Sequence, residues 1–586
     1  MLLQRLTAAF LAIMMLASGA PSVLAQEMAR PAPEAATGFT PKASVEAGDF
    51  MVVAANPLAA EAGYRVLREG GGAVDAAIAV QLVLNLVEPQ SSGIGGGAFL
   101  LHWDALDETL TAYDGRETAP AEAGPDLFLD PDGQPMEFSD AVIGGRSVGT
   151  PGTLRLLELV HRLHGRLPWE RLFQPAIDRA EQGFEVSPRL AALIRSEADS
   201  LRRYPGTRGY FFGPDGEPLA AGARLRNPDF AATLRAVAER GADAFYGGDI
   251  ARDIVRTVRQ AEGNPGKLSQ ADLAGYRVAV RQPVCGGYRA YVVCGMGPPS
   301  SGGLTVLQIL GMLEHFDMAS LDPLSVDATH LFAEASRLAY ADRALYMADA
   351  DFVPMPVAGL LDPSYLMLRA QLIDRDAAIA EPEAGNPPWR DARAYAPDRS
   401  IEIPSTSHVS IVDGRGDIVS MTTTIEAGFG SRLMVRGFLL NNELTDFSFA
   451  AEQDGRPVAN RVEPGKRPRS SMAPTFVFDR AGAPFLVTGS PGGARIIGYV
   501  ARNVIGVVDW GLDPADAVAL PHAVSLGGGV DLEEGTPIAG IEAPLEALGH
   551  TVDVRELNSG LHAIKLHHGK LIGGADPRRE GMALGE

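Results

Sequence analysis

Alternating hydrophobic and polar positions predict a β-hairpin over residues 406–425, since a period of two is typical of a strand. The hydrophobic members of the alternation are Val409, Ile411, Val419 and Met421. The Asp-Gly-Arg-Gly-Asp run at residues 413–417 supplies the turn between the two strands. Residues 384–405 are rich in Pro, Arg and Asp and show neither helical nor strand periodicity, which predicts a flexible linker. Thr406 therefore stands where a linker meets a core strand.

Hydrophobic residues at helical spacing predict several amphipathic helices on both sides of this hairpin. Strands and helices fall in segregated runs rather than in strict alternation. This order favours an α+β fold, with packed sheets flanked by helices, over a doubly wound fold. The predicted helices cover residues 59–87 with a break at 70–72, then 152–163, 169–182, 230–239, 328–348, 496–508 and 514–519, and a second hairpin covers 98–116.

Two motifs suggest other chemistries. The glycine-rich run at residues 93–97 follows a helix and precedes a strand, the reverse of a dinucleotide-binding loop. We interpret it as backbone that approaches another element closely. Ser147 lies in a literal Gly-x-Ser-x-Gly pattern, but residues 150–152 separate it from the next helix, so the sharp turn of a nucleophile elbow is not expected. A serine hydrolase that uses Ser147 stays an alternative.

Thr406 becomes chemically meaningful if the chain is cut just before it. The freed α-amine and the side-chain hydroxyl then lie on the same residue, and an N-terminal amine is a known activator of a threonine nucleophile. The alternative is an ordinary strand threonine that caps or packs.

Charge and composition narrow the partners. The chain has 586 residues, of which 46% are hydrophobic and 21% charged, enough for a large core. Its formal net charge is -22 and no Lys/Arg cluster is evident, which excludes a nucleic-acid partner. An anionic substrate group needs a local positive pocket that works against this overall field.

The first 25 residues have the pattern of a secretory signal. Arg5 supplies the positive start, residues 6–16 the apolar core, and Ala25 the small residue at the cleavage site. The apolar run is short for a membrane anchor. We therefore expect a soluble periplasmic or secreted protein without a membrane anchor.

The two cysteines lie in a segment that reads as two short strands around residues 286–289. Export favours a disulfide between Cys285 and Cys294, and two buried thiols are the alternative. Two cysteines without a nearby histidine make a poor zinc site, and the pair His567-His568 lacks carboxylate or cysteine neighbours. No metal and no cofactor are expected.

Several groups in the chain suit a zwitterionic substrate. Acidic side chains at Glu443 and Asp446 suit an amine, and the fork of Arg116 suits a carboxylate. The adjacent hydroxyls at 470–471 add two donors, and the glycines at 492–493, ahead of a helix, present backbone N–H groups to an oxyanion. Each feature alone is also typical of turns, caps and surfaces.

Together, these motifs resemble the gamma-glutamyltranspeptidases (glutathione hydrolases) of the N-terminal-nucleophile hydrolase superfamily. The resemblance covers nearly all of the chain after the signal. The matching motifs, in order, are SGIGGGAFLL, YDGRETAP, VGTPGT, PPSSGG, TSH at Thr406, TTTIEAGFGS, LLNNELTDFS, KRPRSSMAPT and SPGGARI.

The resemblance implies a four-layer αββα sandwich and a precursor that cuts itself between Ser405 and Thr406. The products would be a large subunit, residues 26–405, and a small subunit, residues 406–586, which build the fold jointly as a heterodimer. By this resemblance Thr406 is the nucleophile, and the hydroxyl of Thr424 helps to orient it. Gly492 and Gly493 donate to the oxyanion. The substrate α-carboxylate is bound by Arg116, Ser470 and Ser471, and the α-amine by Glu426, Glu443 and Asp446.

The implied activity is transfer of γ-glutamyl groups from glutathione or other γ-glutamyl compounds, through a threonyl ester, to water or to an amino acid or dipeptide. Some relatives carry Asn and Gln in place of Glu426 and Glu443, so the amine pocket is more acidic here. Residues 447–469 contain no tyrosine, whereas some relatives close the site with a longer, tyrosine-bearing lid, and a more open pocket would admit larger donors. A glutaryl-type β-lactam acylase and a non-catalytic periplasmic binding protein remain alternatives.

Overall fold

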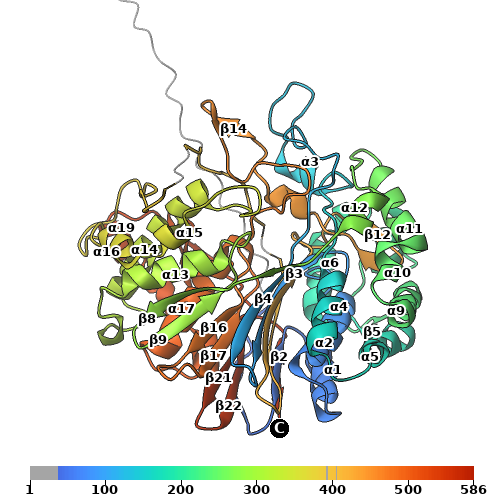
Figure 1. Ribbon diagram of the computed structural model, residues 1–586, viewed down its shortest axis with the longest axis horizontal. Helices are drawn as coiled ribbons and strands as arrows, with labels where there is room; N and C mark the ends of the chain where they lie inside the picture. Colours follow the sequence, from blue (N-terminus) through green and yellow to red (C-terminus); the bar gives the residue numbers. More distant parts are fainter. Residues whose placement is uncertain (1–36, 391–393, 404) are drawn as a thin grey trace, which may run out of the picture.

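Two seven-stranded sheets face each other at the centre of the protein, and helices cover their outer faces (Figure 1). The computed structural model describes residues 37–390, 394–403 and 405–586. The predicted signal, residues 1–25, lies outside the described residues. The predicted α+β fold with the layer order αββα is confirmed.

Both sheets combine strands from before and after Thr406. The first sheet has the order β1 (Val45–Ala47), β22 (Lys570–Ala575), β21 (His562–His567), β17 (Pro484–Gly489), β16 (Thr475–Phe478), β9 (Tyr291–Gly295) and β8 (Val284–Tyr288). The second has the order β23 (Met582–Gly585), β2 (Met51–Ala54), β10 (Ser407–Val412), β11 (Ile418–Thr424), β3 (Gly97–Asp104), β4 (Thr109–Gly115) and β7 (Ala279–Arg281).

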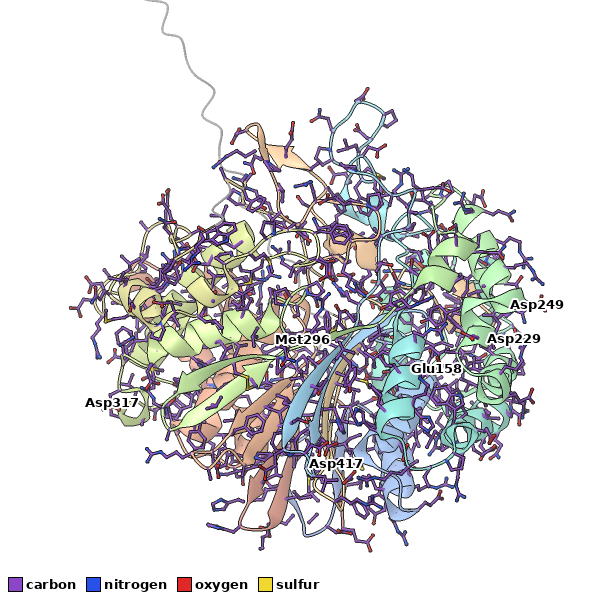
Figure 2. The ribbon with its side chains drawn as sticks, in the orientation of Figure 1. Glu158, Asp229, Asp249, Met296, Asp317 and Asp417 are labelled. Atoms are coloured by element: carbon purple, nitrogen blue, oxygen red, sulfur yellow. A yellow bond between two sulfur atoms is a disulfide. The ribbon has the colours of Figure 1, made fainter. Side chains whose placement is uncertain are left out.

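Each sheet has its own helix layer, and side chains fill the space between the layers (Figure 2). The second sheet is covered by α1 (Pro57–Arg68), α2 (Ala73–Val87) and α4 (Thr153–His164), with α5 (Trp169–Gln182) and α9 (Pro228–Arg240) outside them. The first sheet is covered by α13 (Gly302–Leu313), α17 (Ile496–Val508) and α18 (Pro514–Ala519), and α14 (Val326–Tyr346) packs on α13.

Smaller elements surround this sandwich. The other helices are α3 (Phe138–Val142), α6 (Pro188–Ser196), α7 (Ala198–Leu201), α8 (Pro205–Phe211), α10 (Asp243–Tyr246), α11 (Gly248–Arg259), α12 (Gln270–Gly275), α15 (Val357–Leu360), α16 (Pro363–Ala370) and α19 (Glu542–Ala547). The other strands are β5 (Phe184–Glu185) with β6 (Arg224–Leu225), β12 (Met434–Val435) with β13 (Phe438–Leu439), β14 (Glu452–Gln453) with β15 (Arg456–Pro457), and β18 (Ala523–Ser525), β19 (Val530–Glu533) and β20 (Val552–Arg555).

The predicted hairpin is β10 and β11, at the centre of the second sheet. Val409 pairs with Met421, and their side chains join the core between this sheet and its helices. The alternate polar side chains face the first sheet rather than water. There His408 Nδ1 lies 2.8 Å from Thr422 Oγ1, and Ser420 Oγ donates to a carbonyl of β17. The alternation in β10 and β11 thus sends apolar side chains toward the helices and places polar side chains between the sheets, within an otherwise hydrophobic cluster.

Several predicted boundaries differ from the structure by one or two residues. Helix α14 begins at Val326, two residues earlier than predicted, because Ser325 caps it by accepting a hydrogen bond from Ala328 N. In the cysteine hairpin the glycines at 286–287 belong to β8, and the turn lies at Arg289, which has a φ of 55°. A disulfide joins Cys285 of β8 to Cys294 of β9.

The end of the predicted flexible linker is packed into the protein. Asp398, Glu402 and Ser405 are all buried. Asp398 accepts a hydrogen bond from Asn460 Nδ2 at 2.9 Å, and Ser405 Oγ donates to Gln90 O at 2.9 Å. Individual charged and polar contacts order this stretch, although its sequence has no periodicity.

No helix in the part of the chain that the structure describes is both long enough and apolar enough to cross a bilayer.

The β10–β11 turn, marked by Asp417 in Figure 2, lies at the opposite end of the sandwich from α3 and β14 (Figures 1 and 2). Thr406 immediately precedes β10, so it lies at the end away from that turn.

Candidate active site

Thr406 lies beside Thr424 where β10 begins and β11 ends. In the antiparallel register Ser407 pairs with Thr423, so one more step places Thr406 opposite Thr424. Both threonines line the same pocket. Thr424 Oγ1 accepts a hydrogen bond from the backbone N of Glu426 at 2.8 Å, which fixes its side chain. The sheet register therefore supplies the contact between the two hydroxyl residues.

The glycine-rich run packs directly against this strand end. A Cβ atom on Gly96 would lie 2.0 Å from Thr424 O, and one on Gly95 would lie 2.0 Å from Leu439 O. Only a residue without a side chain fits at such a distance. The predicted close approach of backbone is confirmed, and it fixes Thr424.

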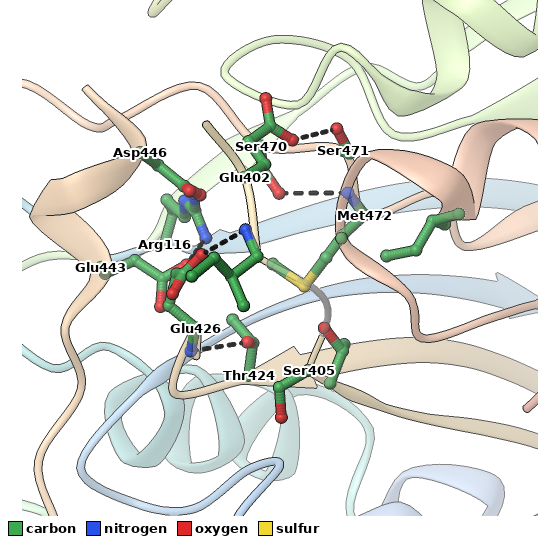
Figure 3. A pocket seen from close by; sticks show the side chains of 14 residues that line it. Arg116, Glu402, Ser405, Thr424, Glu426, Glu443, Asp446, Ser470, Ser471 and Met472 are labelled. Atoms are coloured by element: carbon green, nitrogen blue, oxygen red, sulfur yellow. Dashed lines mark hydrogen bonds and ion pairs between the residues drawn. The ribbon is translucent and has the colours of Figure 1, made fainter. Parts of the chain in front are cut away.

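The pocket around Thr406 brings together most of the residues that the sequence singled out (Figure 3). Gly492 is outside its lining, although the adjacent Gly493 belongs to it. The lining residues are Arg116, Glu402, Ile403, Ser405, Thr406, Thr424, Glu426, Glu443, Asp446, Ser470, Ser471, Met472, Gly493 and Ile496.

Arg116 and the acidic residues form one buried ion-pair cluster. Arg116 donates through Nη1 to Glu443 and through Nη2 to Asp446. Its remaining donors reach Pro468 O at 3.2 Å and Arg469 O at 2.9 Å. The guanidinium expected to receive a substrate carboxylate is thus held by the acids expected to receive the amine.

Burial, together with the crowding of carboxylates, makes two acids of this cluster hold protons, because it raises their pKa. Burial raises the pKa of Asp446 to about 8, although the Arg116 guanidinium acts in the opposite direction. Burial and the carboxylates of Asp446 and Glu443 raise the pKa of Glu426 well above its usual range. Within the described residues, Asp446 Oδ1 is buried without a hydrogen-bond partner. A cation entering here would find acids that ionise to receive it.

Of the two serines, Ser471 belongs to a second charged cluster, and Ser470 is held by the backbone. Met472 N donates to Ser470 Oγ at 3.1 Å, and Ser471 Oγ donates to a carboxylate oxygen of Glu402. Arg343 Nη2 contacts both Ser471 Oγ, at 2.7 Å, and Glu402. Although burial opposes ionisation, Arg343, Arg469 and Ser471 lower the pKa of Glu402 to about 2.

The sequence did not predict Glu402 as a site residue, and it predicted no role in the site for Arg343. Arg343 carried a usable signal, since an arginine in a largely buried helix needs an anionic partner. Glu402 carried a weaker one: it is an isolated acid four residues before Thr406.

The glycine pair at 492–493 forms the turn ahead of α17. Gly492 has a φ of 136° and Gly493 a φ of 57°, both in the region that favours glycine. The pair leads into η3 (Gly493–Arg495) and then into α17. Successive backbone N–H groups before a helix suit a developing negative charge.

The alternative nucleophile is already engaged elsewhere. Ser147 is fully buried, and its Oγ donates to Val142 O at 2.7 Å.

Arg415-Gly416-Asp417 forms the β10–β11 turn, as expected. In the described ranges, no group of three His, Cys, Asp or Glu side chains is arranged to hold a metal ion.

Two facing sheets between helix layers, with a threonine leading the central strand into a polar pocket, define the N-terminal-nucleophile hydrolase class. The family model of gamma-glutamyltranspeptidase matches residues 59–586. The chain therefore belongs to the gamma-glutamyltranspeptidase family and is an enzyme of that hydrolase class. The predicted resemblance is confirmed.

Individual relatives include both hydrolases and acylases. The chain is 39% identical to the glutathione hydrolase proenzyme of Bacillus subtilis (strain 168), over 92% of this chain and 91% of that one. It is 36% identical to the acylase ACY 1 proenzyme of Pseudomonas sp. (strain SE83), over 94% and 96% of the two chains. The crystal structure of cephalosporin acylase from Bacillus halodurans is similar with a TM-score of 0.82 and 28% identity, covering 94% of this chain and 99% of that one.

Proposed function

We propose that the chain cuts itself between Ser405 and Thr406 and then hydrolyses and transfers γ-glutamyl groups. The observation that carries the proposal is the position of Thr406, at the head of β10 in a pocket that holds Thr424, acids and paired serines. The large subunit, residues 26–405, and the small subunit, residues 406–586, would stay together, because each sheet contains strands from both.

In the proposed reaction the α-amine of Thr406 takes the proton from its own hydroxyl, and Oγ1 attacks the γ-amide carbonyl of glutathione or another γ-glutamyl compound. The N–H groups of Gly492 and Gly493 stabilise the resulting oxyanion. The amine leaving group takes the proton and departs, which leaves a γ-glutamyl ester on Thr406. Water, or the amine of an amino acid or dipeptide, then attacks the ester and restores the hydroxyl.

Recognition of the donor follows from its two charged groups. The α-carboxylate binds to Arg116, Ser470 and Ser471, and the α-amine to Glu426, Glu443 and Asp446. The raised pKa of Asp446 supports the second assignment, because an arriving ammonium favours the ionised acid and is bound in return.

A glutaryl-type β-lactam acylase is the second candidate, favoured by the similarity to the two acylases. A glutaryl group carries no α-amine, so Asp446 Oδ1, which has no hydrogen-bond partner among the described residues, would stay unpaired. Burying carboxylates without a partner is costly. The acidic side of the pocket therefore favours a γ-glutamyl donor.

The test combines N-terminal sequencing of the purified protein with turnover of γ-glutamyl-p-nitroanilide. We expect two chains, the smaller beginning TSHVS, together with γ-glutamyl hydrolysis. The Thr406→Ala variant should remain one chain and be inactive, whereas Ser147→Ala should still cut itself and turn over the substrate. An active protein that runs as a single unbroken chain would refute the proposal, and an uncut, inactive one would favour a binding protein.

We also propose that the mature protein is periplasmic or secreted, on the basis of the signal pattern in residues 1–25. Fractionation of the native host should recover the small subunit outside the cytoplasm. Recovery of the cut protein in the cytoplasm alone would contradict this.

A further inference from the structure

The carboxylate of Glu402 lies among buried donors beside the substrate-binding serines. Ser471 Oγ donates to Oε2 of Glu402, and Arg343 Nη2 donates to Oε1. Arg469 Nη2 lies 3.3 Å from the same Oε1. All four side chains are buried. Arginine forks together with a hydroxyl are the donors that bind carboxylates in proteins, so these residues form a carboxylate-binding site that Glu402 fills.

The segment that carries Glu402 is fastened close to the cleavage position. Ile403 N donates to Glu426 Oε1 at 3.3 Å, and Ser405 Oγ donates to Gln90 O at 2.9 Å. Glu402, Ile403 and Ser405 themselves line the pocket, which retains a free volume of about 20 Å³. That is room for about one water molecule, whereas ligand pockets usually offer about 300–1,000 Å³. A γ-glutamyl group fits only after this segment has moved.

We propose that Glu402 is a built-in occupant of the subsite for the donor's α-carboxylate, and that Arg343 is a further carboxylate-binding residue of that subsite. The inference rests on the proposed function, which assigns Ser471 to the same carboxylate. A serine hydroxyl has one proton to donate, so Glu402 and the donor exclude each other. Arg343 is the available cation, because Glu443 and Asp446 already hold Arg116.

Cleavage does not remove Glu402 from the enzyme. After the cut the large subunit ends at Ser405 and keeps Glu402 three residues from its new end. A group tethered in this way has an effective concentration in the millimolar range. The tail therefore competes with the donor. The measured KM equals the KM of the empty subsite divided by the fraction of molecules whose subsite is free of the tail. A purely structural Glu402 would instead affect folding or self-cleavage and leave the KM of the cut enzyme unchanged.

The first experiment compares cut wild-type enzyme with the Glu402→Gln variant, which keeps the shape of the side chain but not its charge. The control is Glu381→Gln, the same change at an exposed position three residues before the linker. If the tail fills nine-tenths of the sites, the KM for γ-glutamyl-p-nitroanilide falls about tenfold in Glu402→Gln. The kcat of Glu402→Gln and both constants of Glu381→Gln should match the wild type. An unchanged or raised KM in a fully cut Glu402→Gln enzyme overturns the proposal.

A second experiment needs no self-cleaving variant and decides the question if Glu402→Gln stays uncut. The peptide RSIEIPS, residues 399–405, is added to cut wild-type enzyme at millimolar concentration, next to the same peptide with glutamine at position 402. We expect competitive inhibition by the glutamate peptide and at least about tenfold weaker inhibition by the glutamine peptide. No inhibition, equal inhibition or non-competitive inhibition overturns the proposal.

The Arg343→Lys variant tests the second half of the inference. Lysine keeps the charge but loses the planar group in which Nε donates to Ser301 Oγ at 2.8 Å while Nη2 contacts Ser471 and the carboxylate. The donor KM and the inhibition constant of the glutamate peptide should rise by a similar factor, and a change in only one of them contradicts a shared subsite. Wild-type enzyme that cuts itself but does not turn over γ-glutamyl donors would refute the proposed function and this inference with it. Normal turnover with a KM that does not depend on Glu402 would refute this inference alone.

Discussion

Replacing Asp446 by asparagine tests how the pocket recognises an α-amine. In the structure, one carboxylate oxygen of Asp446 accepts from Arg116, and the other, Oδ1, has no hydrogen-bond partner among the described residues. Oδ1 is therefore the oxygen left for a substrate ammonium. Asparagine keeps the shape of the side chain but cannot ionise, so it offers a negative charge neither to Arg116 nor to an arriving ammonium.

The size of the effect follows from these two contacts. Removing one partner of a buried, hydrogen-bonded charge pair costs about 2–5 kcal/mol, or roughly 30- to 5,000-fold in kcat/KM for a γ-glutamyl donor. Part of this loss comes from disturbing Arg116 and applies to any donor. A glutaryl donor lacks the amine and shows only that part. The amine contact alone is a hydrogen bond between charged groups, worth about 1.5–3 kcal/mol, so the ratio of the two kcat/KM values should change roughly 10- to 150-fold.

The assay measures kcat/KM for γ-glutamyl-p-nitroanilide and glutaryl-p-nitroanilide with cut enzyme, after a denaturing gel has verified self-cleavage. Asp454→Asn is the matched control, because Asp454 is exposed in the turn between β14 and β15. It should leave both values unchanged. Equal losses for the two donors in Asp446→Asn would refute amine recognition by Asp446 and leave it as a support for Arg116.

Three further outcomes follow from the structure. The Gly96→Ala substitution should impair self-cleavage and lower kcat at least about tenfold, because the new Cβ collides with the carbonyl of Thr424. Gly428→Ala should behave as wild type, because a Cβ at position 428 has no heavy atom within 4 Å. Replacing Cys285 by serine should lower the free energy of unfolding by about 2–3 kcal/mol, since the closed loop is short, with KM unchanged; a changed KM would show that the hairpin reaches the site. The pKa of Asp446 is about 8 in the folded state and 3.8 as its usual value, so between these pH values the folded state binds a proton that the unfolded state has lost. The free energy of unfolding should therefore fall as the pH rises from about 4 to 8. Chemical unfolding of Asp446→Asn should show a shallower fall, and an identical pH profile would contradict the raised pKa.

Local patterns in the sequence were sufficient to predict the scaffold around Thr406. The alternation at Val409 and Met421 predicted the central hairpin, because a strand places every second residue on one face. Glycines at 95 and 96 predicted a close approach of two backbones, and both meet carbonyl groups. These features are readable since each depends on residues that lie close together in the chain.

The contacts of the linker were not readable in this way. Glu402 meets Arg343, 59 residues earlier, and Ser471, 69 residues later. Pairs of charges at such separations leave no period in the sequence, and a stretch rich in Pro, Arg and Asp then reads as flexible. The structure buries the end of that stretch because each charge finds its own partner.

Those pairings also explain how a protein with a net charge of -22 can receive a zwitterion. In the continuous chain each arginine beside the pocket is matched by its own carboxylates: Arg116 by Glu443 and Asp446, and Arg343 by Glu402. A zwitterionic donor brings one anion and one cation, so it adds no net charge to this balance. In the proposed mode of binding its carboxylate takes the place of Glu402, and its ammonium meets Asp446 and Glu426, which burial keeps protonated. Binding therefore exchanges ion pairs within the pocket, and the overall negative field neither opposes nor assists it.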